Sequence, residues 1–326
     1  MIPEITPTAN RRVIASAGFC LVLLVVLSLA IGVEDLSFSG ADGAMPLADL
    51  LSISRLPRTL AAVLAGAGLA VAGQIMQTLT RNRFVEPSTA GTAQSAALGI
   101  LLVTLFLPSA DLGLKALVAS SCALAGTALF LATAHRLPPE QPYLVPLFGL
   151  VYGGVVGAAV TYVAWQNDLL QYLDIWMNGE FSGVLKGRYE LLWIAVLVVA
   201  AAIFFADRLT IMALGEAQAT SLGLNYRRMT QIGLVLVSVM SALSVVVVGL
   251  IPFVGLVVPN LVSRLSGDNL RGTLSQVALG GAILVTACDI LGRVIRFPYE
   301  IPVGTVMGVA GPAIFLWFIL RERRDA

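Results

Sequence analysis

The chain has 326 residues, of which 58% are hydrophobic and 12% charged, and its mean hydropathy is +0.90. A soluble globular domain carries about 25% charged residues, so the composition excludes that class and indicates a polytopic membrane protein. The formal net charge of +1 provides no strongly basic surface, which argues against a nucleic-acid partner.

Charged residues are segregated, which leaves long charge-free stretches. Nine such runs occur, at 13–33, 59–80, 87–110, 116–134, 141–167, 191–206, 229–263, 272–288 and 301–320. A helix needs about 20 residues to cross the roughly 30 Å hydrocarbon core, and most of the runs can do so. We therefore expect an all-α polytopic membrane protein, with one transmembrane domain over residues 1–326 and no soluble domain.

The first run is interpreted as a retained helix. Ser28-Leu29-Ala30 resembles a signal-peptide cleavage site, but the run is longer than a typical h-region and its basic flank starts only at Arg11. The following segment, 34–58, is expected to be an outer loop that ends where Pro57 enters the first turn of the second helix.

Run 229–263 is too long for one span. Its second half contains two glycines and two prolines, so we expect one full helix followed by a short or broken one. Nine runs with one doubled give ten crossings, which places both termini on the same side. With the N-terminus inside, thirteen of the twenty lysines and arginines lie in inner segments and seven in outer ones. The positive-inside bias therefore predicts cytoplasmic termini.

Segment 207–228, on the predicted cytoplasmic side, differs from the apolar runs. Apolar and polar residues alternate in it, and Gly215 and Gly223 punctuate it. We expect two short helices joined by a turn, too polar to insert and apolar enough to dock on a partner. The alternative is a surface helix that lies on the lipid.

Small residues are concentrated in the helices predicted at 141–167 and 301–320. The glycines concerned are Gly149, Gly153, Gly154, Gly157, Gly304 and Gly308. Small residues allow helices to approach closely, so ordinary helix packing is one interpretation. The other is that these helices line a transport pathway.

What the chain lacks bears on its source of energy. Both lysines, Lys115 and Lys186, follow a leucine, so there is no phosphate-binding Gly-Lys motif. The long runs contain no Asp or Glu to couple transport to an ion, and energy is expected from another subunit. Asp289 and Arg293 are spaced for an i,i+4 ion pair near an outer helix end. No catalytic or metal-ligand constellation is found, so we expect no enzyme and no metal site.

Four segments together resemble a known family, the FecCD-type permeases for iron-siderophores, haem and cobalamin. They are SRLPRTLAAVLAGAGLAVAGQIMQTLTRN at 54–82, LGEAQATSLGL at 214–224, GLIPFVGLVVPNLVSRLSGDNLR at 249–271 and CDILGRVIRFPYEIPVGTVMGVAGPAIFLWFIL at 288–320. In many relatives Asn-Pro follows the second helix, whereas here Asn82 is followed by Arg83. The segments RNRFVEPSTAGT, GDNLR and RFPYEIPVGTVMG are most similar to those of the permeases for ferric siderophores of catecholate or related type.

The resemblance implies a permease subunit of a binding-protein-dependent ABC importer in the bacterial inner membrane, which moves a ferric siderophore into the cytoplasm. Its partners would be a second permease, identical or paralogous, and a periplasmic or lipid-anchored substrate-binding protein. Two cytoplasmic ATPase subunits would bind ATP and magnesium, and this chain would bind no cofactor. The alternatives are a cobalamin or haem importer permease and, more distantly, an ion-coupled secondary carrier.

The resemblance also implies roles for particular residues. By motif match, Arg55, Arg58 and Arg293 would dock the binding protein, and the three-residue spacing of the first two would let them form one compact positive site. The coupling helices that contact the ATPase would contain Leu214, Gly215, Glu216, Ala217, Leu222 and Gly223. By position alone, the connection containing Pro138, Pro139 and Pro142 would lie near the cytoplasmic gate.

Overall fold

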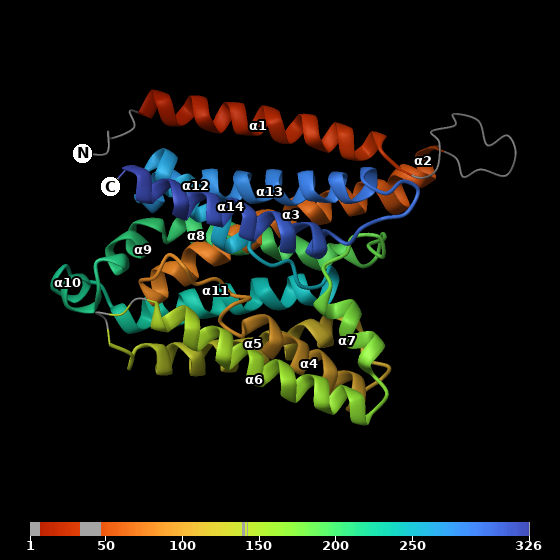
Figure 1. Ribbon diagram of the computed structural model, residues 1–326, viewed down its shortest axis with the longest axis horizontal. Coiled ribbons are helices and arrows are strands. Elements are labelled where there is room, and N and C mark those ends of the chain that lie inside the picture. The colour runs from red at the N-terminus through yellow and green to blue at the C-terminus, as the bar shows by residue number, and fades with distance from the viewer. Residues whose placement is uncertain (1–6, 33–46, 139–140, 142, 326) are drawn as a thin grey trace, which may run out of the picture.

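The computed structural model describes residues 7–32, 47–138, 141 and 143–325. Over these residues the chain forms a helical bundle whose long helices run side by side (Figure 1). The α-helices are α1 (Pro7–Ala30), α2 (Leu47–Leu50), α3 (Leu56–Thr80), α4 (Thr92–Phe106), α5 (Leu112–Ala134), α6 (Leu144–Gln166), α7 (Leu170–Met177), α8 (Ile194–Phe204), α9 (Ala206–Ala213), α10 (Glu216–Ser221), α11 (Tyr226–Val247), α12 (Val254–Ser266), α13 (Leu270–Val294) and α14 (Val303–Asp325). A π-helical turn, η2 (Leu51–Arg55), precedes α3, and a 3₁₀ turn, η3 (Tyr189–Trp193), precedes α8.

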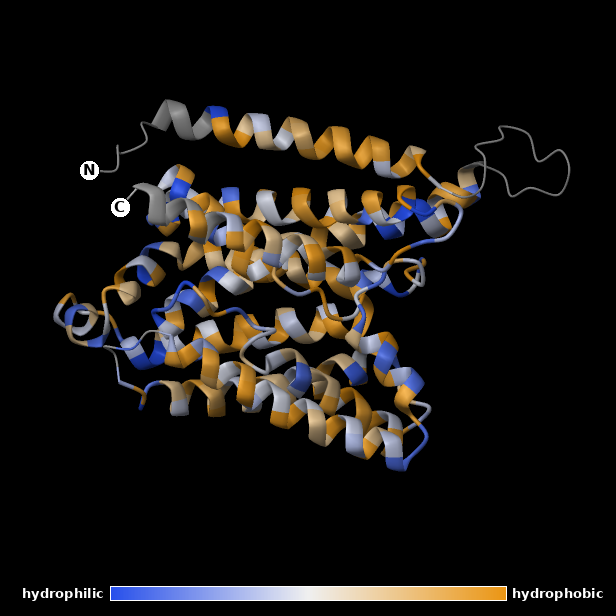
Figure 2. Cartoon of the chain, viewed as in Figure 1, coloured by the Kyte–Doolittle hydropathy of each residue, from blue (hydrophilic) through white to orange (hydrophobic). Residues whose placement is uncertain are grey.

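Within the described part of the chain, six helical segments are long and apolar enough to cross a membrane. They are Arg12–Ala30, Ala48–Thr80, Leu112–Ala134, Leu144–Gln166, Tyr226–Val247 and Leu270–Val294. The bent pair Tyr189–Phe204 and Ala206–Ala213, with 62° between its parts, adds a seventh if counted as one span. Three shorter apolar helices occur at Thr92–Phe106, Val254–Ser266 and Val303–Trp317. Figure 2 shows hydrophobic residues along these helices. The all-helical membrane fold is confirmed, whereas these lengths do not by themselves establish ten crossings.

The expected loop 34–58 is partly helical, because α2 and η2 run directly into α3. Pro57 lies in the first turn of α3, as expected. A proline has no N–H to donate to the carbonyl four residues earlier. That carbonyl, of Ile53, instead accepts from the backbone N–H of Lys186 at 3.0 Å. Segment 47–55 therefore joins the second membrane helix, and the connection before it is shorter than expected.

Run 229–263 forms one full helix, α11, and one short helix, α12, as the sequence predicts. The chain reverses between them through left-handed backbone at Gly249, with φ of 86°, and at Phe253, with φ of 67°. Backbone groups in a membrane interior must find protein partners. At this break the N–H of Leu250 donates to the carbonyl of Trp176 at 3.0 Å, and the carbonyl of Val248 accepts from Glu180 at 2.8 Å. The end of α7 and the segment that follows it therefore supply hydrogen-bond partners for backbone groups at the break between α11 and α12.

Helix α3 lies at the centre of the bundle and packs along α13, with 78% of its apolar window buried. Glycines permit this close approach. A Cβ added to Gly66 would lie 2.4 Å from the backbone oxygen of Gly281, and one added to Gly73 would lie 2.2 Å from Gly255. Both contacts join α3 to helices from the second half of the chain, so any larger residue there forces the helices apart.

Candidate functional site

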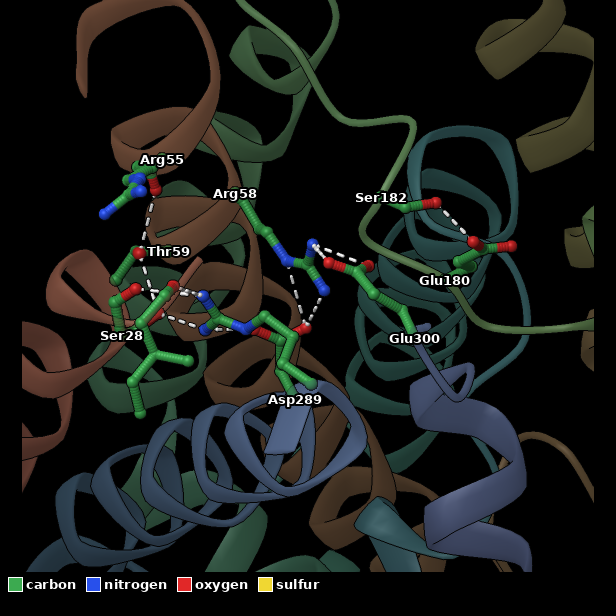
Figure 3. A network of polar contacts seen from close by, with 10 residues as sticks. Ser28, Arg55, Arg58, Thr59, Glu180, Ser182, Asp289 and Glu300 are labelled. Carbon is green, nitrogen blue, oxygen red and sulfur yellow. Dashed lines mark hydrogen bonds and ion pairs between the residues drawn. The ribbon is translucent and has the colours of Figure 1, made fainter. Parts of the chain in front are cut away.

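Four charged side chains form a cluster at the end of the bundle where α3 begins and α13 ends (Figure 3). Arg58 donates through Nε and Nη2 to Oδ1 of Asp289, at 3.2 and 2.8 Å. Its Nη1 donates to both carboxylate oxygens of Glu300, at 2.9 and 2.8 Å. The second oxygen of Asp289 accepts from Nη2 of Arg293 at 2.7 Å, which confirms the ion pair expected from their spacing. Asp289, only 3% exposed, thus bridges two arginines in a group of two cations and two anions.

The end of α1 is held by two arginines. The last carbonyls of a helix have no partner within it and carry the negative end of its dipole. Nη1 of Arg293 donates to the carbonyls of Ser28 and Ile31 at 2.9 and 2.8 Å. Nη1 of Arg55 donates to the two carbonyls between them at 2.9 and 3.2 Å. Since α1 lies on the outside of the bundle along α13 (Figure 1), these bonds fix its end to the rest of the chain.

Arg55 and Arg58 do not form the single exposed positive site that their spacing suggested. They turn to different partners, because α1 supplies acceptors on one side of α3 and α13 supplies them on the other (Figure 3). Arg55 and Arg293 are each 6% exposed, and Arg58 is 14% exposed. Their part in docking a binding protein stays a prediction. Arg58 is the most accessible of the three.

The opposite end of the bundle carries α9 and α10 (Figure 1). The turn between them passes through Gly215, whose φ of 101° is unfavourable for other residues. A Cβ at Gly215 would also lie 3.0 Å from the guanidinium of Arg81. Gly223, with φ of 82°, ends the segment, and α11 begins at Tyr226, slightly before the predicted boundary at residue 228. Two short helices joined by a turn are therefore present, as the sequence predicts.

The surface of this pair of helices combines apolar and charged groups. Leu214 and Leu222 are 54% and 63% exposed, and Glu216 and Ala217 are also exposed. Helix α9 is anchored beneath by the buried side chains of its own apolar face. Exposed leucines beside an acidic residue fit a surface that docks on a partner protein, while the identity of that partner stays a prediction.

Three of the six predicted glycines pack against the backbone of neighbouring turns and loops. A Cβ at Gly149 would lie 2.5 Å from a backbone oxygen, and one at Gly304 would lie 2.8 Å from a backbone nitrogen. A Cβ at Gly153 would lie 3.3 Å from the Cα of another glycine, tighter than most real contacts. At these positions the neighbouring backbone leaves little room for a side chain.

The other glycines face open space. Among the residues that the structure describes, nothing lies within 4 Å of a Cβ at Gly154 or Gly308, and at Gly157 there is only the Gln94 side chain at 3.6 Å. Helix α6, which carries two of them, has only 17% of its apolar window buried. The packing interpretation therefore applies to the three glycines that contact neighbouring backbone. The three open glycines are the ones that a pathway or a second chain could use.

The predicted gate is described only in part. Pro138 follows α5 and is exposed, whereas Pro139 and Pro142 lie outside the described residues. The Nε2 of His135, at the end of α5, lies 3.4 Å from the carbonyl oxygen of Leu79, so this end of α5 contacts the end of α3. The gate assignment stays a prediction.

Sequence reasoning missed one buried acid. Glu86 lies one residue before run 87–110 and is 2% exposed. Its Oε1 accepts from the backbone N–H of Phe253 at 2.8 Å, and the hydroxyl of Ser88 donates to the same oxygen. The carboxylate therefore sits at the start of α12, where the positive end of a helix dipole favours an anion. Glu86 followed by Pro87, just before a helix, was the available signal.

The chain is similar to curated proteins over most of its length. It is 44% identical over 307 residues to the petrobactin import system permease protein YclN of Bacillus subtilis, covering 94% of this chain and 97% of that protein. It is 42% identical over 268 residues to the ferric-anguibactin transport system permease protein FatD of Vibrio anguillarum, covering 82% of this chain and 85% of that protein.

The fold has a close match among solved structures. An inward-facing structure of a metal-chelate type ABC transporter superposes with a TM-score of 0.79, covering 95% of this chain and 99% of that chain. Sequence identity to it is 24%, so this likeness supports the fold alone. The FecCD transport family matches residues 20–321. Given this match, the chain belongs to the FecCD transport family.

Proposed function

We propose that this chain is the permease subunit of an ABC importer that moves a ferric siderophore across the bacterial inner membrane. The observation that carries the proposal is the match, over nearly the full length of both chains, to a petrobactin import permease at 44% identity. The second relative is named for ferric anguibactin, also an iron chelate. A substrate of this class is a bulky ferric chelate, delivered by a separate binding protein.

We further propose ten crossings with both termini in the cytoplasm. The six long segments, the bent pair and the three shorter apolar helices together provide ten. Figure 1 supports this arrangement, since the start of α1 and the end of α14 lie at the same end as α10. The charge bias of the connecting segments is in accord with a cytoplasmic position for that end.

In this scheme α9 and α10 transmit the action of two ATPase subunits. The exposed side chains of Leu214, Glu216 and Leu222 supply the contact, and the left-handed Gly215 holds the turn. ATP hydrolysis takes place on the partner chains, and this chain contributes no catalytic group. The opposite end, which carries Arg58 and Glu300, receives the binding protein.

The pathway is proposed to run between this chain and a second permease. Helices α6 and α14 support this proposal, because each carries an open glycine, Gly154 and Gly308 respectively. Large apolar side chains beside these glycines, such as Val155 at 65% and Val309 at 72%, are also exposed. Such faces in a single chain require lipid or another protein to cover them.

The test is transport by the reconstituted complex of permease, ATPase and binding protein in proteoliposomes. ATP-dependent uptake of radioactive iron bound to petrobactin or anguibactin is expected, with no uptake when the ATPase carries an inactive nucleotide site. Uptake of cobalamin or haem in place of the ferric chelate would refute the substrate class. Uptake driven by a proton or sodium gradient without ATP would refute the importer assignment altogether.

A further inference from the structure

A groove of about 400 Å³ opens between α5, η3 with α8, and α11. That volume lies in the range of about 300–1,000 Å³ typical of ligand pockets. Its walls are apolar side chains with three serines among them. The exposed wall residues are Leu117 at 63%, Val235 at 45% and Ile194 at 37%. Since all three helices belong to membrane-crossing segments, the groove opens toward hydrocarbon.

The groove is separate from the features used above for transport. None of its described lining residues belongs to α6 or α14, and none to the α9–α10 pair. The site of the charged cluster around Asp289 is also distinct from it. Its occupant therefore need not be the substrate, the ATPase or the second permease.

A cation directly precedes the turn that supplies part of the groove wall, although it is not itself a lining residue. Arg188 is the residue before η3, and in a 3₁₀ turn residues three apart lie one above the other. Arg188 therefore aligns with Leu191 and Ile194, which both line the groove. Its Nε is buried and has no hydrogen-bond partner among the described residues. The carboxylate of the neighbouring Glu190 accepts instead from the N–H of Gly187 at 2.8 Å.

The position of Arg188 along the bundle is also defined. The backbone bond from Lys186 to Ile53 ties its loop to the segment before α3. This is the end of the bundle that carries Arg58, near the ends of the membrane helices. Arg188 therefore lies where a lipid head group would be, at the boundary of a bilayer leaflet. The groove lies where the acyl chain would be, in the interior of that leaflet.

One hydroxyl in the wall also lacks a partner. Ser120 and Ser121 donate to the carbonyls four residues earlier at 2.7 and 2.9 Å, as serines in membrane helices commonly do. The hydroxyl oxygen of Ser238, on α11, is buried and has no partner among the described residues. It lines the same groove. The wall thus contains one buried hydroxyl whose hydrogen-bonding capacity is unused among the described residues.

We propose that this groove binds one phospholipid, with an acyl chain between α5, α8 and α11 and the phosphate paired with Arg188. The pairing of a phosphate with a guanidinium is a strong, charge-assisted contact. A helix from another protein fits less well, because it would have to pair its own anionic group with Arg188 at one end of an apolar stripe. The site should prefer anionic lipids, since each basic group near a membrane surface contributes about 1 kcal/mol.

The experiment counts lipid molecules retained by the purified complex, using native mass spectrometry. Val235→Trp fills the groove, and Val196→Trp is the matched control, because Val196 on α8 is similarly exposed at 44% but lies outside the groove. We expect the complex to retain one lipid per chain with Val196→Trp and to lose it with Val235→Trp. Equal retention by the two variants would overturn the proposal, as would loss of the second permease in place of lipid.

A second measurement does not depend on the Trp variant folding. The complex is exchanged into nanodiscs containing phosphatidylglycerol and phosphatidylcholine, and the composition of the retained lipid is determined. Arg188→Gln is expected to reduce the preference for phosphatidylglycerol by about fivefold, whereas Lys186→Gln, in the same loop, should leave it unchanged. An unchanged preference in Arg188→Gln would show that the phosphate does not pair there.

Discussion

The bridging position of Asp289 gives the sharpest prediction about stability. Its two oxygens serve Arg58 and Arg293, which are 14% and 6% exposed, so Asp289→Asn removes the charge shared by two largely buried cations. Removing one partner of a buried ion pair costs about 3–5 kcal/mol, because a charge is left without compensation. Glu300 is 24% exposed, and a solvated pair contributes only about 0.2–1 kcal/mol. Asp289→Asn is therefore expected to destabilise the fold several times more than Glu300→Gln.

The assay compares unfolding of the two variants in the same detergent, as half-life at a fixed temperature, because membrane proteins commonly unfold irreversibly. The double variant Asp289→Asn with Arg293→Met restores charge balance, since Arg58 and Glu300 remain paired. Arg293→Met also removes the hydrogen bonds to the end of α1, so the double variant is compared with both single variants and should lose less half-life than their two effects added together. Equal half-lives for Asp289→Asn and Glu300→Gln, or additive effects in the double variant, would refute the account of the cluster.

The remaining predictions concern transport. Gly153→Leu should lower the yield of folded protein, because a Cβ at this position would contact neighbouring backbone. Gly154→Leu should fold and still obstruct uptake, because a Cβ there lies in open space. Parental uptake by Gly154→Leu would place that face against lipid. Glu216→Arg should leave the permease folded and reduce transport-stimulated ATP hydrolysis, and normal stimulation would remove the coupling assignment. Arg58→Gln adds no carboxylate to the cluster and leaves Asp289 paired with Arg293, and it should slow association of the binding protein most at low salt, where screening is weakest. Arg296→Gln, an exposed change outside the cluster, controls for net charge, and equal effects of the two would argue against a specific role for Arg58.

Segment positions were predictable because the bilayer imposes a length and a polarity on every helix. The doubled run was recognised from its glycines and prolines, and α11 and α12 lie where those residues require. Boundaries next to prolines were less predictable. Pro57 suggested that a loop ended there, because it leaves the carbonyl of Ile53 without its donor within the helix. That carbonyl instead accepts from the backbone N–H of Lys186, which is distant in sequence. Only the tertiary structure supplies such a partner.

The charged cluster was predictable only where its members are close in sequence. The pair formed by Asp289 and Arg293 followed from i,i+4 spacing on one helix. By contrast, Arg58 meets Glu300 across 242 positions of the chain, and Arg55 meets the end of α1. Basic residues at helix ends are ordinarily read as exposed anchors. Here the ends of α1 and α13 converge on α3, and the same residues become buried.

Glu86 shows that charge-free runs alone do not exclude an ion-coupled carrier, because a buried acid can lie just outside a run. A buried carboxylate is the feature expected of an ion-coupled carrier, and Glu86 is buried although it lies just outside the run. Its oxygen is already engaged by Phe253 and Ser88, at the start of the helix that follows the break in run 229–263. The adjoining cavity, of about 20 Å³, has room for about one water molecule and none for a chelate. A carboxylate that caps a broken helix therefore has a structural role that requires no coupled ion, and the buried acid does not weigh against an importer driven by ATP.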